Sequence, residues 1–310
     1  MLVVVALGGN ALIRRGQRAD AEVQRRNAQT AVDSIAAIAQ RHDLVVTHGN
    51  GPQVGLLALQ SEAYRDAAPY PLDVLGAETE GMLGYMLEQG LRNALPERQV
   101  AALLTQVVVR ADDPGFASPS KPVGPVYSRE QAQALARQRN WSVAPDGDAW
   151  RRVVPSPQPQ EVVELATIQL LLDAGVLVIC TGGGGIPVVA GAHGELRGVE
   201  AVIDKDLAAA LLATRLHADA LLILTDVAAV MRDWGTPTAS PIGAVAAAEL
   251  RAMRFAGGSM GPKVEAACRF VEAGGAMAGI GALGDAAAIL DRNCGTVVTA
   301  APTREPAAAP

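Results

Sequence analysis

Cysteine, aromatic residues and lysine are all scarce in this chain of 310 residues. The three cysteines, Cys180, Cys268 and Cys294, lie far apart, which argues against a disulfide framework and for a reducing compartment. No CxxC or HExxH motif occurs and the four histidines are scattered, so the sequence predicts no dedicated metal site. Aromatic residues make up only 3%, so aliphatic side chains must fill the core.

Long apolar runs and an excess of positive charge are also missing. No run approaches the ~20 uncharged residues of a membrane span, and the run from Leu2 to Leu7 is too short for a secretory signal. The net charge of -6 disfavours nonspecific nucleic-acid binding, although it leaves room for a local cationic pocket. We therefore expect a soluble, cytoplasmic protein that binds small molecules, and neither nucleic acid nor a membrane as partner.

Two common motifs occur without the surroundings that they need. Residues 279–284 fit GxGxxG, but no second strand and acidic residue follow, so a glycine turn between a strand and a helix is expected rather than a dinucleotide site. Residues 257–261 fit GxSxG, but a helical pattern precedes them and no histidine follows His217. The sequence therefore disfavours an oxidoreductase and a serine hydrolase.

The chain does contain an alternation of helical and strand patterns. Helical periodicity is found over 20–41 and 161–174. Apolar runs typical of buried parallel strands lie at 2–7, 43–47, 99–105, 176–181 and 219–225. Such alternation predicts an α/β fold in which helices cover both faces of a parallel sheet.

Residues 110–160 interrupt the alternation, because they are rich in proline and hold two of the three tryptophans. PSPQP at 155–159 cannot lie inside a helix or a central strand. We interpret this segment as a small lid, the alternative being an ordered surface loop. The tail 301–310 is predicted to be disordered.

Glycine-rich turns follow three of the predicted strands. These turns contain Gly8, Gly9 and Asn10, then Gly49, Asn50 and Gly51, then Gly182, Gly183, Gly184 and Gly185. The carboxyl ends of parallel strands line the ligand-binding edge of a sheet, and glycine there lets backbone N–H groups approach an anion. We predict a site for phosphate or another compact anion; tight turns without a ligand are the alternative.

Only three of the 26 basic residues are lysines: Lys121 in SKPVGP, Lys205 in VIDKDL and Lys263 in GSMGPKVEA. Lysine offers a mobile point charge that can follow a migrating phosphoryl group, and Asp206 is placed to orient Lys205. A lone lysine is more often a surface residue, but three in such contexts favour phosphoryl transfer. A nucleotide would then sit near 225–227, where a predicted strand ends.

Motifs spread over residues 2–299 resemble those of the amino acid kinase family. LGGNAL, GGGGIP, LTDV and GSMGPKVEA are its general marks, and THGNGPQVG, KPVGPVYS, RRVVPSPQP and GVEAVIDKD resemble the branch that acts on carbamate. The resemblance implies a three-layer αβα sandwich with a central, mostly parallel sheet and a lid subdomain at about 110–160. It also implies a carbamate lobe at 1–205 and a nucleotide lobe at 206–300.

The implied reaction is ATP + carbamate ⇌ ADP + carbamoyl phosphate, with Mg²⁺ carried by the nucleotide and a homodimer as the assembly. Lys205 and Lys263 would stabilise the transferring phosphoryl group, Asp206 would organise them, and Lys121 would reach carbamoyl phosphate from the lid. The substrate side would be lined by Gly8, Gly9, Asn10, Gly49, Asn50, Gly51, Gly183 and Gly184. The nucleotide side would be lined by Thr225, Asp226, Val227, Gly258, Ser259, Met260 and Gly261.

Other functions stay open from the sequence. A sibling kinase that phosphorylates another small carboxylate would need a pocket for a carbon side chain and would normally lack the lid. A regulatory nucleotide-binding protein of the same fold is a second alternative, against which the intact lysine set argues. A role in arginine breakdown and one in the use of purine-derived carbamoyl phosphate are equally compatible with the sequence.

Overall fold

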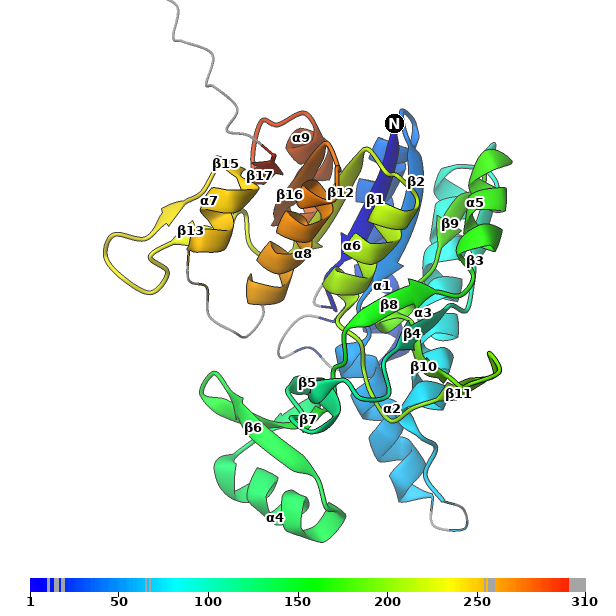
Figure 1. The fold of residues 1–310 in the computed structure, drawn as a ribbon, viewed down its shortest axis with the longest axis vertical. Coiled ribbons are helices and arrows are strands. Elements are labelled where there is room, and N and C mark those ends of the chain that lie inside the picture. The colour runs from blue at the N-terminus through cyan, green and yellow to red at the C-terminus, as the bar shows by residue number, and fades with distance from the viewer. Residues whose placement is uncertain are drawn as a thin grey trace, which may run out of the picture.

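An eight-stranded sheet forms the middle of this computed structural model (Figure 1). Its strands follow the order β15 (Ala244–Ala246), β17 (Thr296–Thr299), β16 (Met277–Ala282), β12 (Ala220–Thr225), β1 (Leu2–Leu7), β2 (Asp43–His48), β9 (Leu177–Ile179) and β3 (Val100–Ala102). Only β16 and β17 pair antiparallel among these neighbours, so the sheet is mostly parallel, as predicted.

The structure describes residues 1–9, 12–13, 17, 20–64, 66, 68–253, 255 and 260–300. Three residues of the predicted site, Asn10, Gly258 and Ser259, lie outside the described residues, and so does the tail 301–310.

Helices cover both faces of the sheet and complete the three-layer α/β fold (Figure 1). One face is covered by α1 (Ala21–Ala39), α3 (Leu72–Ala94) and α9 (Ala286–Leu290). The other is covered by α5 (Leu165–Asp173), α6 (Lys205–Arg215), α7 (Ala247–Ala252) and α8 (Met260–Glu272). In β1, Val3 and Val5 pack on the first face while Val4 and Ala6 pack on the second, which explains why this strand is a continuous apolar run.

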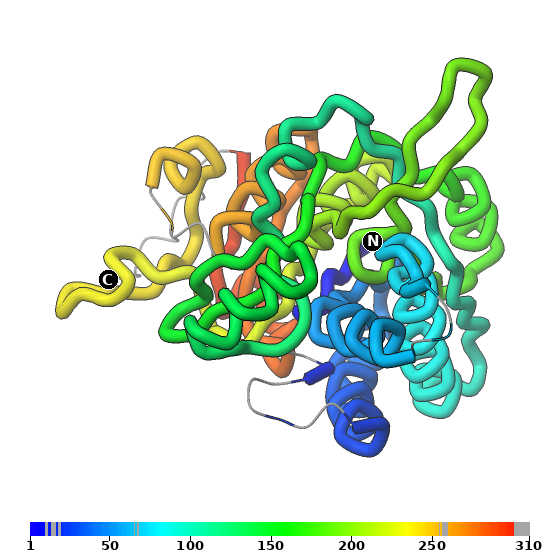
Figure 2. The backbone as a smooth tube through the Cα atoms, turned by 90° about the horizontal axis from the view of Figure 1, so that it is seen from below, coloured from blue at the N-terminus to red at the C-terminus, as the bar shows by residue number. Residues whose placement is uncertain are grey.

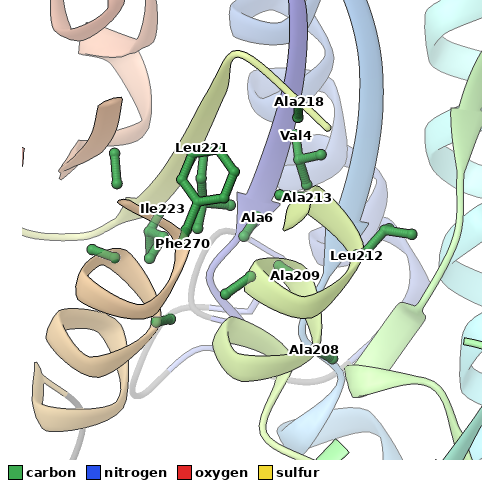
Figure 3. Packing of buried hydrophobic residues seen from close by; sticks show 14 of the residues in the cluster. Val4, Ala6, Ala208, Ala209, Leu212, Ala213, Ala218, Leu221, Ile223 and Phe270 are labelled. Atoms are coloured by element: carbon green, nitrogen blue, oxygen red, sulfur yellow. The ribbon is translucent and has the colours of Figure 1, made fainter. Parts of the chain in front are cut away.

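Alanine allows α6 to pack closely on the sheet (Figure 3). Ala208, Ala209 and Ala213 are completely buried in the cluster that contains Val4 and Ala6 of β1. Phe270 of α8 fills the neighbouring space beside Leu221 and Ile223, as close packing of a core requires.

Smaller elements surround the central sheet. A four-stranded sheet contains β11 (Leu196–Gly198), β10 (Ile186–Ala190), β4 (Gln106–Val109) and β8 (Pro159–Val162), and a two-stranded one contains β13 (Met231–Arg232) and β14 (Ser240–Pro241). A three-stranded sheet of β5 (Lys121–Tyr127), β7 (Ala149–Val154) and β6 (Ser142–Asp146) is accompanied by α4 (Arg129–Arg139). We call residues 121–154 the lid; they protrude from the body and contact α2 (Gly51–Ala63) (Figures 1 and 2).

Three expectations about elements need correction. The strand expected over 99–105 is only β3, because the chain then leaves the central sheet and forms β4 beside β10 and β8. The helix expected over 161–174 begins at Leu165, since residues 159–162 pair with β4 as β8. Gly279 and Gly281 of the GxGxxG match lie inside β16, and only Gly284 lies at the turn that follows.

Among the described residues, no helix combines the length and apolar character needed to cross a membrane.

Candidate active site

The glycine turns lie side by side at one edge of the central sheet. They follow β1, β2 and β9, which are consecutive in the sheet and parallel. Backbone hydrogen bonds join the strand ends: Gly8 N–H donates to Leu224 O at 2.8 Å, and Gly49 N–H donates to Leu7 O at 3.0 Å. The structure thus brings the predicted substrate-side residues that it describes together at the carboxyl ends of the strands.

Lys205 and Lys263 converge on a single carboxylate at this edge. Lys205 begins α6 and contacts Oδ1 of Asp206, while Lys263, in the first turn of α8, donates to Oδ2 at 3.0 Å. The Asp206 side chain is only 3% exposed, and the side chains of Lys205 and Lys263 are 9% and 11% exposed. A buried carboxylate therefore holds two ammonium groups in one place, which satisfies charges that could not be buried alone.

Burial and pairing act in opposite directions on these three groups. Burial favours the neutral form of Asp206, but the two ammonium groups outweigh it and keep the pKa of the carboxyl below its usual value. At Lys205 burial prevails, helped by the neighbouring Lys263, and the pKa is lowered. At Lys263 burial is outweighed by the Asp206 carboxylate, and the pKa is raised.

Lys121, the first residue of β5 in the lid, also reaches this cluster. Its Nζ lies 2.5 Å from Oδ2 of Asp204, the residue that precedes Lys205. Asp204 is the N-cap of α6, and its Oδ1 accepts from the N–H groups of Asp206 at 2.9 Å and Leu207 at 3.2 Å. The structure therefore gathers all three lysines of the chain around two adjacent carboxylates.

Two glycines show why the turns carry no side chains. A Cβ on Gly49 would lie 2.8 Å from the backbone N of Gly9 and 3.2 Å from Cδ of Lys205, so the lysine stem passes directly over this turn. Gly183 has φ +68°, and a Cβ there would lie 2.1 Å from Nδ2 of Asn50. Asn50 is in turn fixed by donating to Oγ1 of Thr79 at 2.8 Å. Gly51 opens α2 next to Asn50, and Gly184 is buried beside Gly183.

The predicted nucleotide residues that the structure describes lie next to the lysine pair. Thr225 ends β12, the neighbour of β1, and its Oγ1 donates to Oδ1 of Asp226 at 3.1 Å. The Asp226 carboxylate contributes to the raised pKa of Lys263, which places it within electrostatic reach of that ammonium. The half-buried Val227 follows directly, and Met260 and Gly261 begin α8, one turn before Lys263.

Glu80, His48 and Asp204 are parts of the site that sequence reasoning missed. Glu80 accepts from Gly182 N–H at 2.6 Å and from Thr105 N–H at 3.1 Å, and burial raises its pKa to about 8. His48 is completely buried beside Gly182, and burial lowers its pKa to about 4. Glu80 could have been found, because it falls on the buried face of α3 that the buried Leu83, Leu87 and Leu91 continue.

The chemistry of this edge is that of an anion site. The clustered ammonium groups of Lys121, Lys205 and Lys263 favour phosphate and carboxylate ligands rather than a metal ion. Within the ranges that the structure describes, no three His, Cys, Asp or Glu side chains come together in a way that could hold a metal ion.

Comparisons with known proteins agree with this geometry. A family model described as the amino acid kinase family matches residues 1–280. The chain is 53% identical to the carbamate kinase of Haemophilus influenzae, over 96% of this chain and 97% of that protein. It is 55% identical to the carbamate kinase of Rhizobium meliloti, over 96% and 93%. Among solved structures, carbamate kinase from Giardia lamblia bound to AMP-PNP has a TM-score of 0.87 and 40% identity, covering 96% of this chain and 98% of that one.

Proposed function

The chain belongs to the amino acid kinase family, and we propose that it is an ATP-dependent carbamate kinase that catalyses ATP + carbamate ⇌ ADP + carbamoyl phosphate. The observation that carries this function is the convergence of Lys205 and Lys263 on Asp206 where the glycine turns meet. Phosphoryl transfer needs positioned positive charge more than covalent help from the protein, and this arrangement supplies it.

In the forward reaction a carbamate oxygen attacks the γ-phosphorus of ATP. The new O–P bond forms as the bond to the bridging oxygen of ADP breaks, and the leaving oxygen keeps that electron pair. Carbamate is already an anion, so no general base has to remove a proton. Lys205 and Lys263 stabilise the phosphoryl group in flight, Asp206 holds their ammonium groups in place, and Lys121 contacts carbamoyl phosphate from the lid.

The two substrates occupy opposite sides of the boundary between β1 and β12. Residues 1–205 form the lobe for carbamate and carbamoyl phosphate, and residues 206–300 form the nucleotide lobe. The carbamate side uses the turns at Gly8-Gly9, at Gly49-Asn50-Gly51 and at Gly183-Gly184. The nucleotide side uses Thr225-Asp226-Val227 and the start of α8. Support comes from the parallel pairing of β1 with both β2 and β12, which aligns the turns that follow these three strands.

We propose that Mg²⁺ arrives with the nucleotide, whose phosphate charge it would neutralise. The donor set fits this, because Mg²⁺ in such sites needs only one or two carboxylates beside phosphate oxygens and water. The exposed Asp226, at the end of β12, is the carboxylate of this chain best placed to approach it.

We further propose a cytoplasmic homodimer that serves arginine metabolism, with purine-derived carbamoyl phosphate as the alternative source. The lack of a membrane-crossing helix among the described residues is compatible with the cytoplasm. The surface around β3, the last strand in the sheet order, supports a second copy: Leu104 is 54% exposed and lies against α3, on which Tyr85 is 49% exposed. Sedimentation of the purified protein tests the dimer.

ATP formation from ADP and carbamoyl phosphate, measured with a coupled assay, tests the reaction. We expect Lys205→Met to lower kcat by roughly 10²-fold to 10³-fold, because one charged transition-state contact is lost. Arg215→Met, at the exposed far end of the same helix, is the matched control and should keep full activity. Turnover with acetylglutamate but none with carbamoyl phosphate would show that the protein is a sibling kinase rather than a carbamate kinase.

A further inference from the structure

Asp204 contacts the lid and the start of α6 with different oxygens of one carboxylate. Oδ1 caps α6, which presents Lys205 and Asp206, and Oδ2 pairs with Lys121 of the lid. The side chain is 10% exposed, so it contributes little surface for any other partner. One buried side chain thus joins α6 to the lid, whose Lys121 lies 83 residues before Asp204 in the sequence.

We infer that Asp204 is a positioning residue that holds the lid lysine, Lys121, at the phosphoryl site before substrate arrives and links the lid to α6. The inference rests on the proposed function, since it assigns Lys121 to carbamoyl phosphate. Asp204 acts through Lys121 and touches no reacting atom.

Charge explains why such a group is needed. Lys121, Lys205 and Lys263 bring three positive charges together, and Asp206 alone would leave an excess of two. Like charges in a partly buried site repel strongly, so Lys121, with 28% of its side chain exposed, would swing into solvent. Asp204 lowers the excess to one and favours the charged forms of Lys205 and Lys263 as well.

A phosphate ligand can replace Asp204 as the partner of Lys121. The incoming anion offers the same kind of charge-assisted hydrogen bond, so the ammonium exchanges one oxygen partner for another. The ammonium group of Lys121 therefore keeps an anionic oxygen partner both when substrate enters and when it leaves.

The lid has a second attachment that keeps this exchange local. Gly124 of β5 packs against Gly55 of α2 so closely that a Cβ on Gly55 would lie 1.9 Å from Cα of Gly124. Arg151 of β7 donates to Gly124 O at 2.7 Å and so holds the same glycine in place. Lys121 lies only three residues before Gly124, so Asp204 restrains the end of the lid that faces α6.

Hydrogen exchange followed by mass spectrometry tests the inference without using activity. Asn and Ser cap helices about as well as Asp, so Asp204→Asn and Asp204→Ser keep the cap but lose the charge that pairs with Lys121. We expect severalfold faster exchange of amides within 121–154 in both variants and unchanged exchange within 205–215. The control is Asp20→Asn at the N-cap of α1, where Asp20 accepts from Val23 N–H at 2.9 Å; it should leave the lid unchanged. Unchanged lid exchange in both Asp204 variants would overturn the inference.

A kinetic cycle tests the coupling to Lys121. Asp204→Asn should raise KM for carbamoyl phosphate on the order of tenfold with little change in kcat, because the competent lid position is less populated. In a Lys121→Met background the same change should alter KM less than twofold. Equal effects in both backgrounds would show that Asp204 acts without Lys121 and would overturn the inference. A wild-type protein without activity would instead contradict the proposed function. The hydrogen-exchange experiment would then decide alone whether Asp204 holds the lid.

Discussion

Between about pH 4.5 and pH 8, Glu80 keeps a proton in the folded protein that an ordinary carboxyl group would have lost. Burial raises its pKa to about 8, although the N–H groups of Thr105 and Gly182 favour the charged form. The folded state therefore binds a proton that the unfolded chain releases near pH 4.5. The resulting stability is fully present below that pH and is lost as the pH rises to about 8.

We predict that the free energy of unfolding falls by about 1.5 kcal/mol between pH 6.5 and pH 8, and that Glu80→Gln removes most of this slope. Urea unfolding at several pH values measures it. The range avoids His48, whose pKa of about 4 gives a slope of the opposite sign between roughly pH 4 and pH 6.5. Glu78→Gln, at an exposed position of the same helix, should keep the wild-type slope; a slope that survives in Glu80→Gln would contradict the prediction.

Gly183 occupies a backbone conformation that disfavours other residues, at φ +68°. Gly183→Ala would add left-handed strain of ~1 kcal/mol and drive a methyl group into Asn50. We expect a loss of about 1–3 kcal/mol of stability and a raised KM for carbamoyl phosphate. The matched control is Gly76→Ala in α3, where a Cβ meets nothing within 4 Å; it should be neutral or stabilising. Equal behaviour of the two variants would show that the turn tolerates a side chain.

At the scale of elements, the lid is fastened to α2 by a cluster around Trp141. The Cζ atoms of Arg139 and Arg152 lie 4.9 Å and 4.7 Å from the centroid of its ring. Both arginines also pair with Glu62 near the end of α2. A single carboxylate therefore pairs with two cations that stack on one aromatic ring.

We predict that Glu62→Gln loosens this fastening with little effect on global stability. Partly exposed ion pairs contribute only about 0.2–1 kcal/mol each, so the midpoint of unfolding should shift slightly. Locally, the two arginines repel each other, Trp141 becomes more exposed and its fluorescence moves to longer wavelength, while exchange in α4 speeds up. The exposed Glu22→Gln, which loses a pair with Arg26 inside α1, serves as control. Unaltered fluorescence and exchange would mean that other contacts seat the lid.

The strands that could be predicted are those whose sequence alone implies burial. β1, β2 and β12 match the predicted runs to within one residue, because strands buried on both faces are apolar throughout. The end of the strand expected over 99–105 could not be predicted, because the chain pairs with β9 only as β3 and then, as β4, pairs with β10 and β8. These partner residues lie 50 or more positions away in the sequence, so no local pattern reports them.

In the candidate site too, local sequence reveals some residues, whereas others depend on partners far away in the chain. Lys205 and Asp206 are neighbours in the sequence, and glycine-framed contexts drew attention to Lys263 and Lys121. Their roles in the reaction remain predictions that the kinetic variants test. The hydrogen bond between Glu80 and Gly182 joins residues that lie 102 positions apart, so it could not be read from local sequence.

At the scale of the whole molecule, the proposed substrate sites meet where the two halves of the chain join. β1 from the N-terminal half pairs with β12 from the C-terminal half, and β1 also pairs with β2. A nucleotide at the proposed site would contact the end of β12 and the start of α8, which belong to the same buried cluster as β1 and α6. Ligand binding should therefore stabilise the cooperative core rather than one loop.

We predict that ADP at 100 times its Kd raises the free energy of unfolding by about 2.7 kcal/mol, or roughly 5 °C in Tm for a chain of this size. The shift follows from binding to the folded state alone, so it should grow with the logarithm of the ADP concentration. NAD at equal concentrations is the control, because Gly279 and Gly281 of the GxGxxG match lie inside β16 rather than in a turn after it. Differential scanning fluorimetry measures both ligands. Stabilisation by NAD without stabilisation by ADP would contradict the nucleotide assignment, whereas stabilisation by ADP alone would support it.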